Sequence, residues 1–173
     1  MFILDKDKSY QKETESKVVI RFQDCDPLKH LNNAKYFDYF FNAREDQVPR
    51  LYDLQMVDFH TVYKATWVVY NHQISYIKPA IMGEWVRIMS RLIWYNENTI
   101  LLEYYMTDES KKQLKTLLWS TMRYVKIDTG KSTPHEGMVL DFLKATLLPD
   151  IHIPDSGFMD RIRQLKNELI YTV

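Results

Sequence analysis

The sequence is poor in cysteine and glycine. Among its 173 residues there are one cysteine, Cys25, and four glycines. A single cysteine cannot form a disulfide within the chain, so the fold needs no oxidising compartment. The scarcity of glycine, together with 12 tyrosines and 4 tryptophans, is typical of a well-ordered, sheet-rich protein rather than a flexible or low-complexity one.

The sequence also lacks an excess of charge of either sign and any long apolar run at its start. Lysine and arginine together number 23, as do aspartate and glutamate, and the two signs are interspersed. This balance gives no strong field to attract nucleic acid or an anionic membrane, so neither is expected as a partner. The chain becomes polar after four apolar residues, too few for a signal peptide or a membrane span. A cytoplasmic location is therefore expected.

Several sequence signatures of catalysis are missing. There is no glycine-rich phosphate loop, no dinucleotide-binding fingerprint and no G-x-S-x-G nucleophile elbow. The histidines outside residues 24–36 are widely spaced and form no metal-ligand pattern with the single cysteine; they are His60, His72, His135 and His152. Neither a metal nor a cofactor is predicted.

Hydrophobic patterns predict five strands. In the first, over residues 17–22, Val18, Ile20 and Phe22 share one face. The others are expected over residues 66–77, 85–94, 99–106 and 114–127. Alternation within the segment 85–94 places Trp94 on the same face as Val86, Ile88 and Leu92. The connecting segments are turn-like, so the strands are predicted to form an antiparallel meander.

A helical pattern follows the first strand. Phe37, Phe40 and Phe41 recur at helical spacing, with polar residues on the opposite side, and this aromatic stripe is expected to pack in the core. Asn32 fits the N-cap position, and Pro49 disfavours helical geometry at the residue before it. The helix is therefore predicted over residues 33–48.

The order of these elements predicts the architecture. One long helix followed by a run of strands favours an α+β fold, in which a curved antiparallel sheet wraps around a long central helix. Residues 137–148 and 156–169 also have helical spacing. We therefore expect a polar N-terminal segment over 1–16, one domain over 17–130 and a helical C-terminal extension over 131–173. The length is sufficient for one core but not for a second full domain.

The polar segment from Asp24 to Tyr36, D-C-D-P-L-K-H-L-N-N-A-K-Y, is the densest in chemically active groups. It connects the first strand to the N-terminus of the helix, where unpaired N–H groups and the helix dipole favour anions. Such a helix end can stabilise the oxyanion that forms when a carbonyl is attacked. A carboxylate beside it can act as a nucleophile or as a general base toward water.

These residues resemble a known signature. Residues 22–27, F-Q-D-C-D-P, and 32–36, N-N-A-K-Y, resemble the signature of the 4-hydroxybenzoyl-CoA thioesterase family of hotdog proteins. Residues 74–84 resemble the exit and turn after the second strand of that family, and the strand order agrees over about 17–128. The resemblance implies a hotdog fold, Asp26 as the catalytic carboxylate and a backbone N–H near Asn33 as the oxyanion donor.

The same stretch also resembles plant acyl-ACP thioesterases and bacterial long-chain acyl-CoA thioesterases. Their related motif contains an aspartate, a histidine and paired asparagines, matched here by Asp26, His30, Asn32 and Asn33. The acyl-ACP enzymes have a further asparagine where this chain has Leu28, so it departs from their full catalytic set. The plant enzymes fuse two hotdog units, whereas this chain holds one. The resemblance therefore implies a homodimer or homotetramer in which a second subunit completes the substrate cleft.

These matches predict that Asp26, His30 and Asn33 are catalytic and that Asn32 and Tyr36 bind substrate. Structural alternatives remain open. Asp26 could cap the helix or stabilise its loop, His30 could order the turn around Asp26, and Asn32 could be a helix cap.

Two further residues of the segment have structural interpretations. Asp24 fits a turn or a helper role better than direct catalysis. Cys25 has only His30 as a nearby base, and small buried cysteines are common, so a nucleophilic role is not expected.

The predicted function is hydrolysis of an acyl-CoA to the free acid and CoA, without a cofactor. An acyl-ACP thioesterase is the nearest alternative, supported by the match at His30, Asn32 and Asn33. A non-catalytic hotdog module that binds acyl-CoA or a lipid is an alternative from a different class. A hotdog dehydratase ranks last, because those enzymes arrange a histidine and an acidic residue differently.

Overall fold

The computed structural model describes residues 4–5, 8–54, 57, 59–148, 151 and 157–171. The predicted helix start at residue 156 lies outside these ranges. The main elements are β1 (Glu13–Val19), α1 (Lys35–Tyr52), β2 (Ala65–Tyr76), β3 (Trp85–Tyr95), β4 (Thr99–Asp108), β5 (Leu114–Lys126), α3 (Gly137–Thr146) and α4 (Phe158–Tyr171). Two short helical turns are η1 (Phe22–Asp24) and η2 (Phe59–Tyr63), and the second was not predicted. No helix in the described part of the chain is long and apolar enough to cross a membrane.

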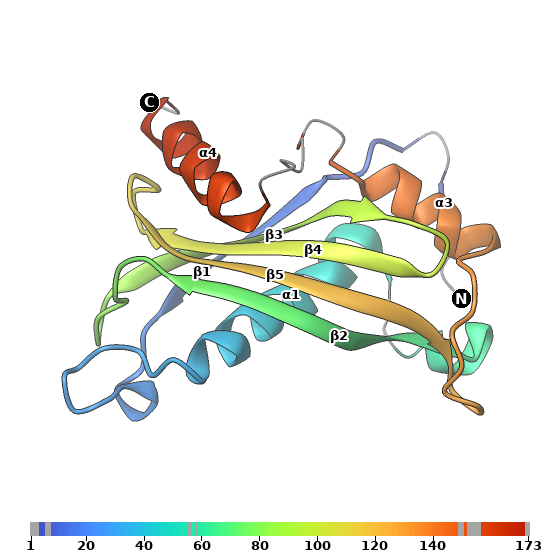
Figure 1. The fold of residues 1–173 in the computed structure, drawn as a ribbon, viewed down its shortest axis with the longest axis horizontal. Coiled ribbons are helices and arrows are strands. Elements are labelled where there is room, and N and C mark those ends of the chain that lie inside the picture. The colour runs from blue at the N-terminus through green and yellow to red at the C-terminus, as the bar shows by residue number, and fades with distance from the viewer. Residues whose placement is uncertain are drawn as a thin grey trace.

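The five strands form one antiparallel sheet in the order β1-β3-β4-β5-β2, so β1 and β2 are its edges. Helix α1 runs along the sheet, and α4 and α3 lie near its opposite ends (Figure 1). Phe40 of α1 is fully buried against this sheet, and its ring lies 5.8 Å from that of Tyr104 on β4. The α+β architecture predicted from the order of elements is therefore confirmed.

The first strand begins earlier than its hydrophobic pattern indicates. β1 starts at Glu13 rather than at residue 17 and ends at Val19, before the predicted end at 22. Its polar half pairs with β3, where Glu13 forms an ion pair with Arg91 and Glu15 forms one with Arg87. Because these ion-pair partners lie on β3, the first half of β1 is polar and lacks the alternation of apolar residues that predicts a strand.

Helix α1 continues through Pro49, contrary to the prediction that it ends at residue 48. Val48 and Tyr52 are both buried, so the apolar face of the helix extends past the proline. The helix ends where Asp53 adopts a left-handed conformation (φ 54°) and donates its N–H to the carbonyl of Pro49. The packing of this last turn stabilises the helix by more than the loss of the backbone hydrogen bond that Pro49 cannot donate.

The prediction that Trp94 shares a face with Val86, Ile88 and Leu92 is wrong. The register between β3 and β4 shifts between Leu92 and Trp94. The first three residues are buried in the core under α1, whereas Trp94 is exposed. An irregularity of this kind adds a residue to one strand and changes the direction of the side chains that follow it.

Helix α4 packs on the outer face of the sheet, opposite α1, over a second apolar cluster. This contact includes a buried charged cluster. Arg161 of α4 donates from Nε to Glu103 Oε2 at 3.0 Å, and Arg91 of β3 contacts Glu103 Oε1 at 2.6 Å. Burial alone would raise the pKa of the Glu103 carboxyl, but the two guanidinium groups outweigh burial and lower it.

Loss of Arg161 should therefore destabilise the fold. Arg161→Ala leaves the fully buried Glu103 with Arg91 as its one cationic partner among the described residues, beside the N–H of Trp119. Breaking a buried pair from one side costs about 3–5 kcal/mol. Urea unfolding measures this change, with Lys166→Ala on the exposed side of α4 as the control. A free energy of unfolding equal to that of the control variant would show that the cluster does not hold α4 in place.

Candidate active site

The loop between β1 and α1 is a small, tightly bonded hairpin. Cys25 and Leu31 form an antiparallel bridge. Asp26 donates its N–H to the carbonyl of His30 at 2.8 Å, and Asn32 donates its N–H to the carbonyl of Asp24 at 2.9 Å. These bonds bring Asp24 and Asp26 beside the residues that lead into the helix.

The carboxylate of Asp26 is held by one of its two oxygens. Oδ1 accepts the backbone N–H of Leu28 at 2.9 Å and that of His30 at 3.0 Å. Oδ2 has no hydrogen-bond partner among the described residues, and the side chain is only partly buried. The carboxylate is therefore fixed in orientation while one oxygen remains available.

The N–H of Asn33 is free at the entry to α1. Its neighbours are bonded: Ala34 donates its N–H to Asn32 Oδ1 at 3.0 Å, and Lys35 donates to the carbonyl of Asn32 at 2.8 Å. Within the described residues, no acceptor is found for the N–H of Asn33. Its carbonyl accepts the hydroxyl of Tyr76 at 3.0 Å, which ties this position to β2.

His30 contributes to this geometry through its backbone. Its N–H and carbonyl both bond to Asp26, and it forms an isolated bridge with Ile81. The imidazole makes no hydrogen bond to any part of the chain that the structure describes. The observed contacts match the structural interpretation, in which His30 orders the turn around Asp26.

Asn32 makes a cap-like bond but lies two residues before the observed N-cap, so the prediction that it is the N-cap is wrong. The helix begins at Lys35 with Ala34 as its N-cap residue, so the predicted start at residue 33 is two residues early. The side chain of Asn32 nevertheless accepts the N–H of Ala34 in the turn that leads into the helix. The Asn32 side-chain oxygen is therefore already bonded to a backbone N–H, as a capping side chain would be.

Tyr36 is placed differently from the prediction that it binds substrate. Its side chain is 2% exposed, and its hydroxyl accepts the N–H of Ala80 at 3.1 Å. Its ring packs edge-on against Tyr76, with centroids 5.1 Å apart. The hydroxyl is thus bonded to the backbone of the turn over residues 78–84, and substrate binding by Tyr36 stays a prediction.

Tyr39 was missed by the sequence analysis. Its hydroxyl donates to Asp24 Oδ2 at 2.9 Å and accepts the N–H of Arg21 at 2.9 Å, which joins the loop to the second turn of α1. Burial, together with the neighbouring Asp24 carboxylate, raises the pKa of Tyr39 to about 12. Asp24 therefore acts as an anchor of the loop. The tyrosine could not be identified from sequence, because its spacing only indicated a helix side chain.

The turn over residues 78–84 supports the loop from the other side. Leu31 donates its N–H to the carbonyl of Ala80 at 2.8 Å, and Met82 donates to the carbonyl of Lys29 at 2.9 Å. Lys115 of β5 is buried and contacts Glu84 Oε1 at 2.8 Å and the carbonyl of Pro79 at 2.9 Å. The sequence of residues 78–84 resembled a turn of the family, but no pattern in the sequence indicated that Lys115 would contact it.

Cys25 is unsuited to nucleophilic attack. Burial raises the pKa of its thiol, and the neighbouring carboxylates of Asp24 and Asp26 raise it further. The thiolate is the reactive form of cysteine, so these carboxylates disfavour it. Among the described residues, no group of three or more histidine, cysteine or acidic side chains could hold a metal ion.

Residues 20–145 match the family model described as the thioesterase-like superfamily. The chain belongs to this superfamily. Membership confirms the hotdog fold and the thioester hydrolase class that the resemblance implied. The matched segment contains the loop, α1, the last four strands and nearly all of α3.

Known thioesterases resemble the chain in sequence and in fold. The long-chain acyl-CoA thioesterase FadM of Escherichia coli (strain K12) is 25% identical over 130 residues, which cover 75% of this chain and 96% of FadM. The crystal structure of YbaW, a probable thioesterase from Escherichia coli, has a TM-score of 0.69 and 24% identity, covering 78% of this chain and 98% of YbaW. The 12:0-ACP thioesterase from Umbellularia californica has a TM-score of 0.73 and 11% identity, covering 83% of this chain and 54% of the plant enzyme.

Proposed function

We propose that this thioesterase hydrolyses acyl-CoA, with Asp26 as the catalytic carboxylate and the N–H of Asn33 as the oxyanion donor. The observation that carries the proposal is the state of the Asp26 carboxylate. Two backbone N–H groups hold one oxygen, while the other has no partner in the described structure. The similarity to FadM, a long-chain acyl-CoA thioesterase, supports CoA as the carrier. A cytoplasmic location stays a prediction from the sequence.

The geometry supports two routes for Asp26. Its free oxygen can remove a proton from water while the water oxygen attacks the thioester carbon, or it can attack that carbon directly and form an anhydride that water then hydrolyses. In either route the carbonyl oxygen becomes negative, and the free N–H of Asn33 stabilises it. Collapse of the tetrahedral intermediate breaks the carbon–sulfur bond and releases the thiolate of CoA, which takes up a proton.

The role of His30 in this proposal is weaker. Its backbone N–H orients Asp26, and its side chain belongs to the matched motif. Asn32 shapes the entry to the helix by accepting the N–H of Ala34. Both residues therefore act chiefly by positioning the two catalytic groups.

The edge strand β2 is the proposed contact between two subunits of a homodimer. Its outer edge is unpaired within the chain, and Val68, Val69 and Tyr70 on it are 42%, 50% and 65% exposed. An exposed apolar edge pairs readily with another strand, and a second copy can present the same strand across a twofold axis. Helix α4 occupies part of the outer sheet face, so we propose a homodimer through β2, with the homotetramer as the alternative.

Asp26→Asn should abolish turnover without unfolding the protein. The amide oxygen can still accept the N–H groups of Leu28 and His30, but it can neither attack nor take up a proton. General-base catalysis typically contributes about 10²–10⁴-fold, so a loss in kcat of at least this order is expected. Thiol release from acyl-CoAs of varied chain length, including an aromatic one, measures it.

Wild-type protein and the same acyl chain on ACP serve as controls for the Asp26→Asn experiment. Retained activity in the variant would contradict the role of Asp26. If the wild-type protein hydrolyses acyl-ACP but not acyl-CoA, the carrier is ACP. Tight acyl-CoA binding without turnover of either thioester would identify a binding module.

A pair of substitutions at Asn33 tests the backbone donor. Asn33→Pro removes the N–H, whereas Asn33→Ala keeps it and removes only the side chain. Loss of one oxyanion donor lowers kcat by about 10²–10³-fold, so the proline variant should lose this activity and the alanine variant should keep most of it. Circular dichroism and thermal unfolding check that both remain folded. Equal activity in two folded variants would rule out the Asn33 N–H as the donor.

Val69→Lys should separate the two subunits. A lysine on an exposed edge strand opposes strand pairing and leaves the fold of the monomer intact. Light scattering after size exclusion should change from twice the chain mass of 20.8 kDa to a single chain. Val62→Lys on η2, a similarly exposed valine, is the control and should stay dimeric. An unchanged mass for Val69→Lys, or a monomeric wild type, would contradict the β2 interface.

A further inference from the structure

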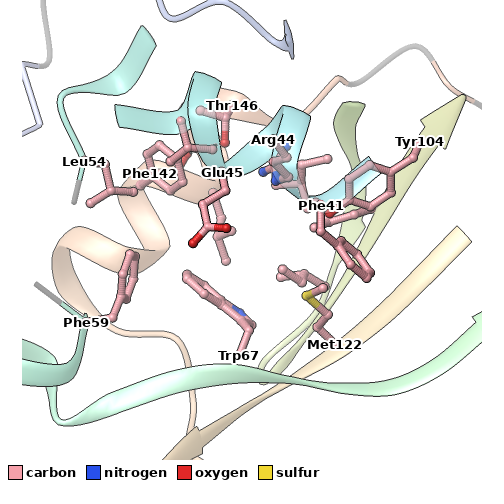
Figure 2. Close-up of a pocket in the computed structure, with 15 residues that line it drawn as sticks. Phe41, Arg44, Glu45, Leu54, Phe59, Trp67, Tyr104, Met122, Phe142 and Thr146 are labelled. Carbon is pink, nitrogen blue, oxygen red and sulfur yellow. Dashed lines mark hydrogen bonds between the residues drawn. The ribbon is translucent and has the colours of Figure 1, made fainter. Parts of the chain in front are cut away.

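A cavity of about 240 Å³ lies under the C-terminal half of α1. Apolar side chains from α1, the sheet, η2 and α3 converge around it, as Figure 2 shows. They include Phe41, Phe59, Trp67, Leu102, Met122 and Phe142. None of the residues lining the cavity comes from the loop that holds Asp26, so the proposed active site does not account for it.

Helix α1 connects the active-site loop with this cavity. The loop leads into the N-terminal end of α1, whereas α3 lies at the opposite end of the sheet (Figure 1). Lys35 and Glu45 are ten residues apart, which at about 1.5 Å per residue is about 15 Å along the helix axis. The cavity is therefore at a distance that suits the far part of an extended acyl chain.

The surface between these two ends is aromatic and partly accessible. Phe37 and Phe41 of α1 pack on His72 of the edge strand β2, with ring centroids 5.1 and 5.7 Å apart. All three side chains are only partly buried, and Phe41 also lines the cavity. Burial lowers the pKa of His72, which favours the neutral ring beside an alkyl chain.

Two charged side chains of α1 border this apolar space. Arg44 donates from Nη1 to Ser90 Oγ on β3 at 3.0 Å. The carboxylate of Glu45 instead points into the space above Trp67 (Figure 2). Glu45 is exposed to water, and no ion pair joins it to another residue that the structure describes. An alkyl group placed against this carboxylate would remove it from water without supplying a hydrogen bond, which is unfavourable.

We propose that this cavity receives the end of the substrate's acyl chain and that Glu45 limits the length of chain that fits. The inference rests on the proposed thioesterase function. Chains that reach into the cavity bury apolar surface and gain affinity, whereas longer chains meet the carboxylate. Glu45 is thus a specificity residue in the wall of the cavity, remote from the reacting carbonyl.

Substitutions at opposite sides of the cavity should shift the chain-length preference in opposite directions. Glu45→Leu removes the charge and should raise kcat/KM for the longest saturated acyl-CoAs on the order of tenfold, with little effect on short ones. Met122→Trp fills the cavity and should lower kcat/KM for long chains by a similar factor while sparing short ones. The measurement is kcat/KM for a saturated series from short to long chains, with thermal unfolding of each variant.

Asp46→Leu is the matched control, because Asp46 is the next residue of α1 and faces a different groove, beside β1. It should leave the profile unchanged. If wild-type protein hydrolyses acyl-CoAs but Glu45→Leu keeps the wild-type preference, the inference is overturned and the thioesterase function stands.

If wild-type protein hydrolyses none of the acyl-CoAs, the same series is measured as binding by calorimetry. Affinity that rises with chain length, and extends to longer chains in Glu45→Leu, supports the cavity even without turnover. Affinity that does not depend on chain length, or that Glu45→Leu and Asp46→Leu change alike, overturns the inference.

Discussion

The active-site loop depends on two backbone N–H groups that converge on one oxygen of Asp26. Leu28 and His30 donate to Oδ1 at 2.9 and 3.0 Å, which fixes the carboxylate and pairs two amides of the turn at once. A carboxylate has a second oxygen with its own acceptor sites, so the hydrogen bonds to Oδ1 leave Oδ2 available. In the proposed mechanism, structure and chemistry use different atoms of this side chain, so removing the side chain would disturb both.

The two faces of the sheet pack against different parts of the chain. The face under α1 carries the main core, the aromatic surface beside β2 and the cavity. The outer face carries α4 and the cluster of Arg91, Glu103 and Arg161. A buried carboxylate is costly unless its oxygens are well paired, so the cluster specifies where α4 docks more than it adds net stability. The cavity proposed to bind the acyl chain therefore lies on the α1 side.

Helix α1 links the chemistry with the proposed selectivity. Asn33, whose N–H has no acceptor among the described residues, lies in the turn just before α1, and the C-terminal half of α1 forms a wall of the cavity. A packed helix has a fixed rise per residue, so the distance between the two ends varies little. In the proposed function, α1 therefore fixes the distance between the cleaved thioester in the loop before it and the cavity that receives the end of the chain.

The sequence by itself determined the features that depend on neighbours in the chain. Hydrophobic periodicity gave the order of strands and helices, and the motif around Asp26 indicated the thioesterase family, since both signals are local. Only the tertiary structure revealed the polar start of β1, the helix beyond Pro49, the roles of Tyr39 and Lys115, and the cavity at Glu45. Each of these depends on contacts between residues far apart in the chain, and such contacts leave no regular spacing in the sequence.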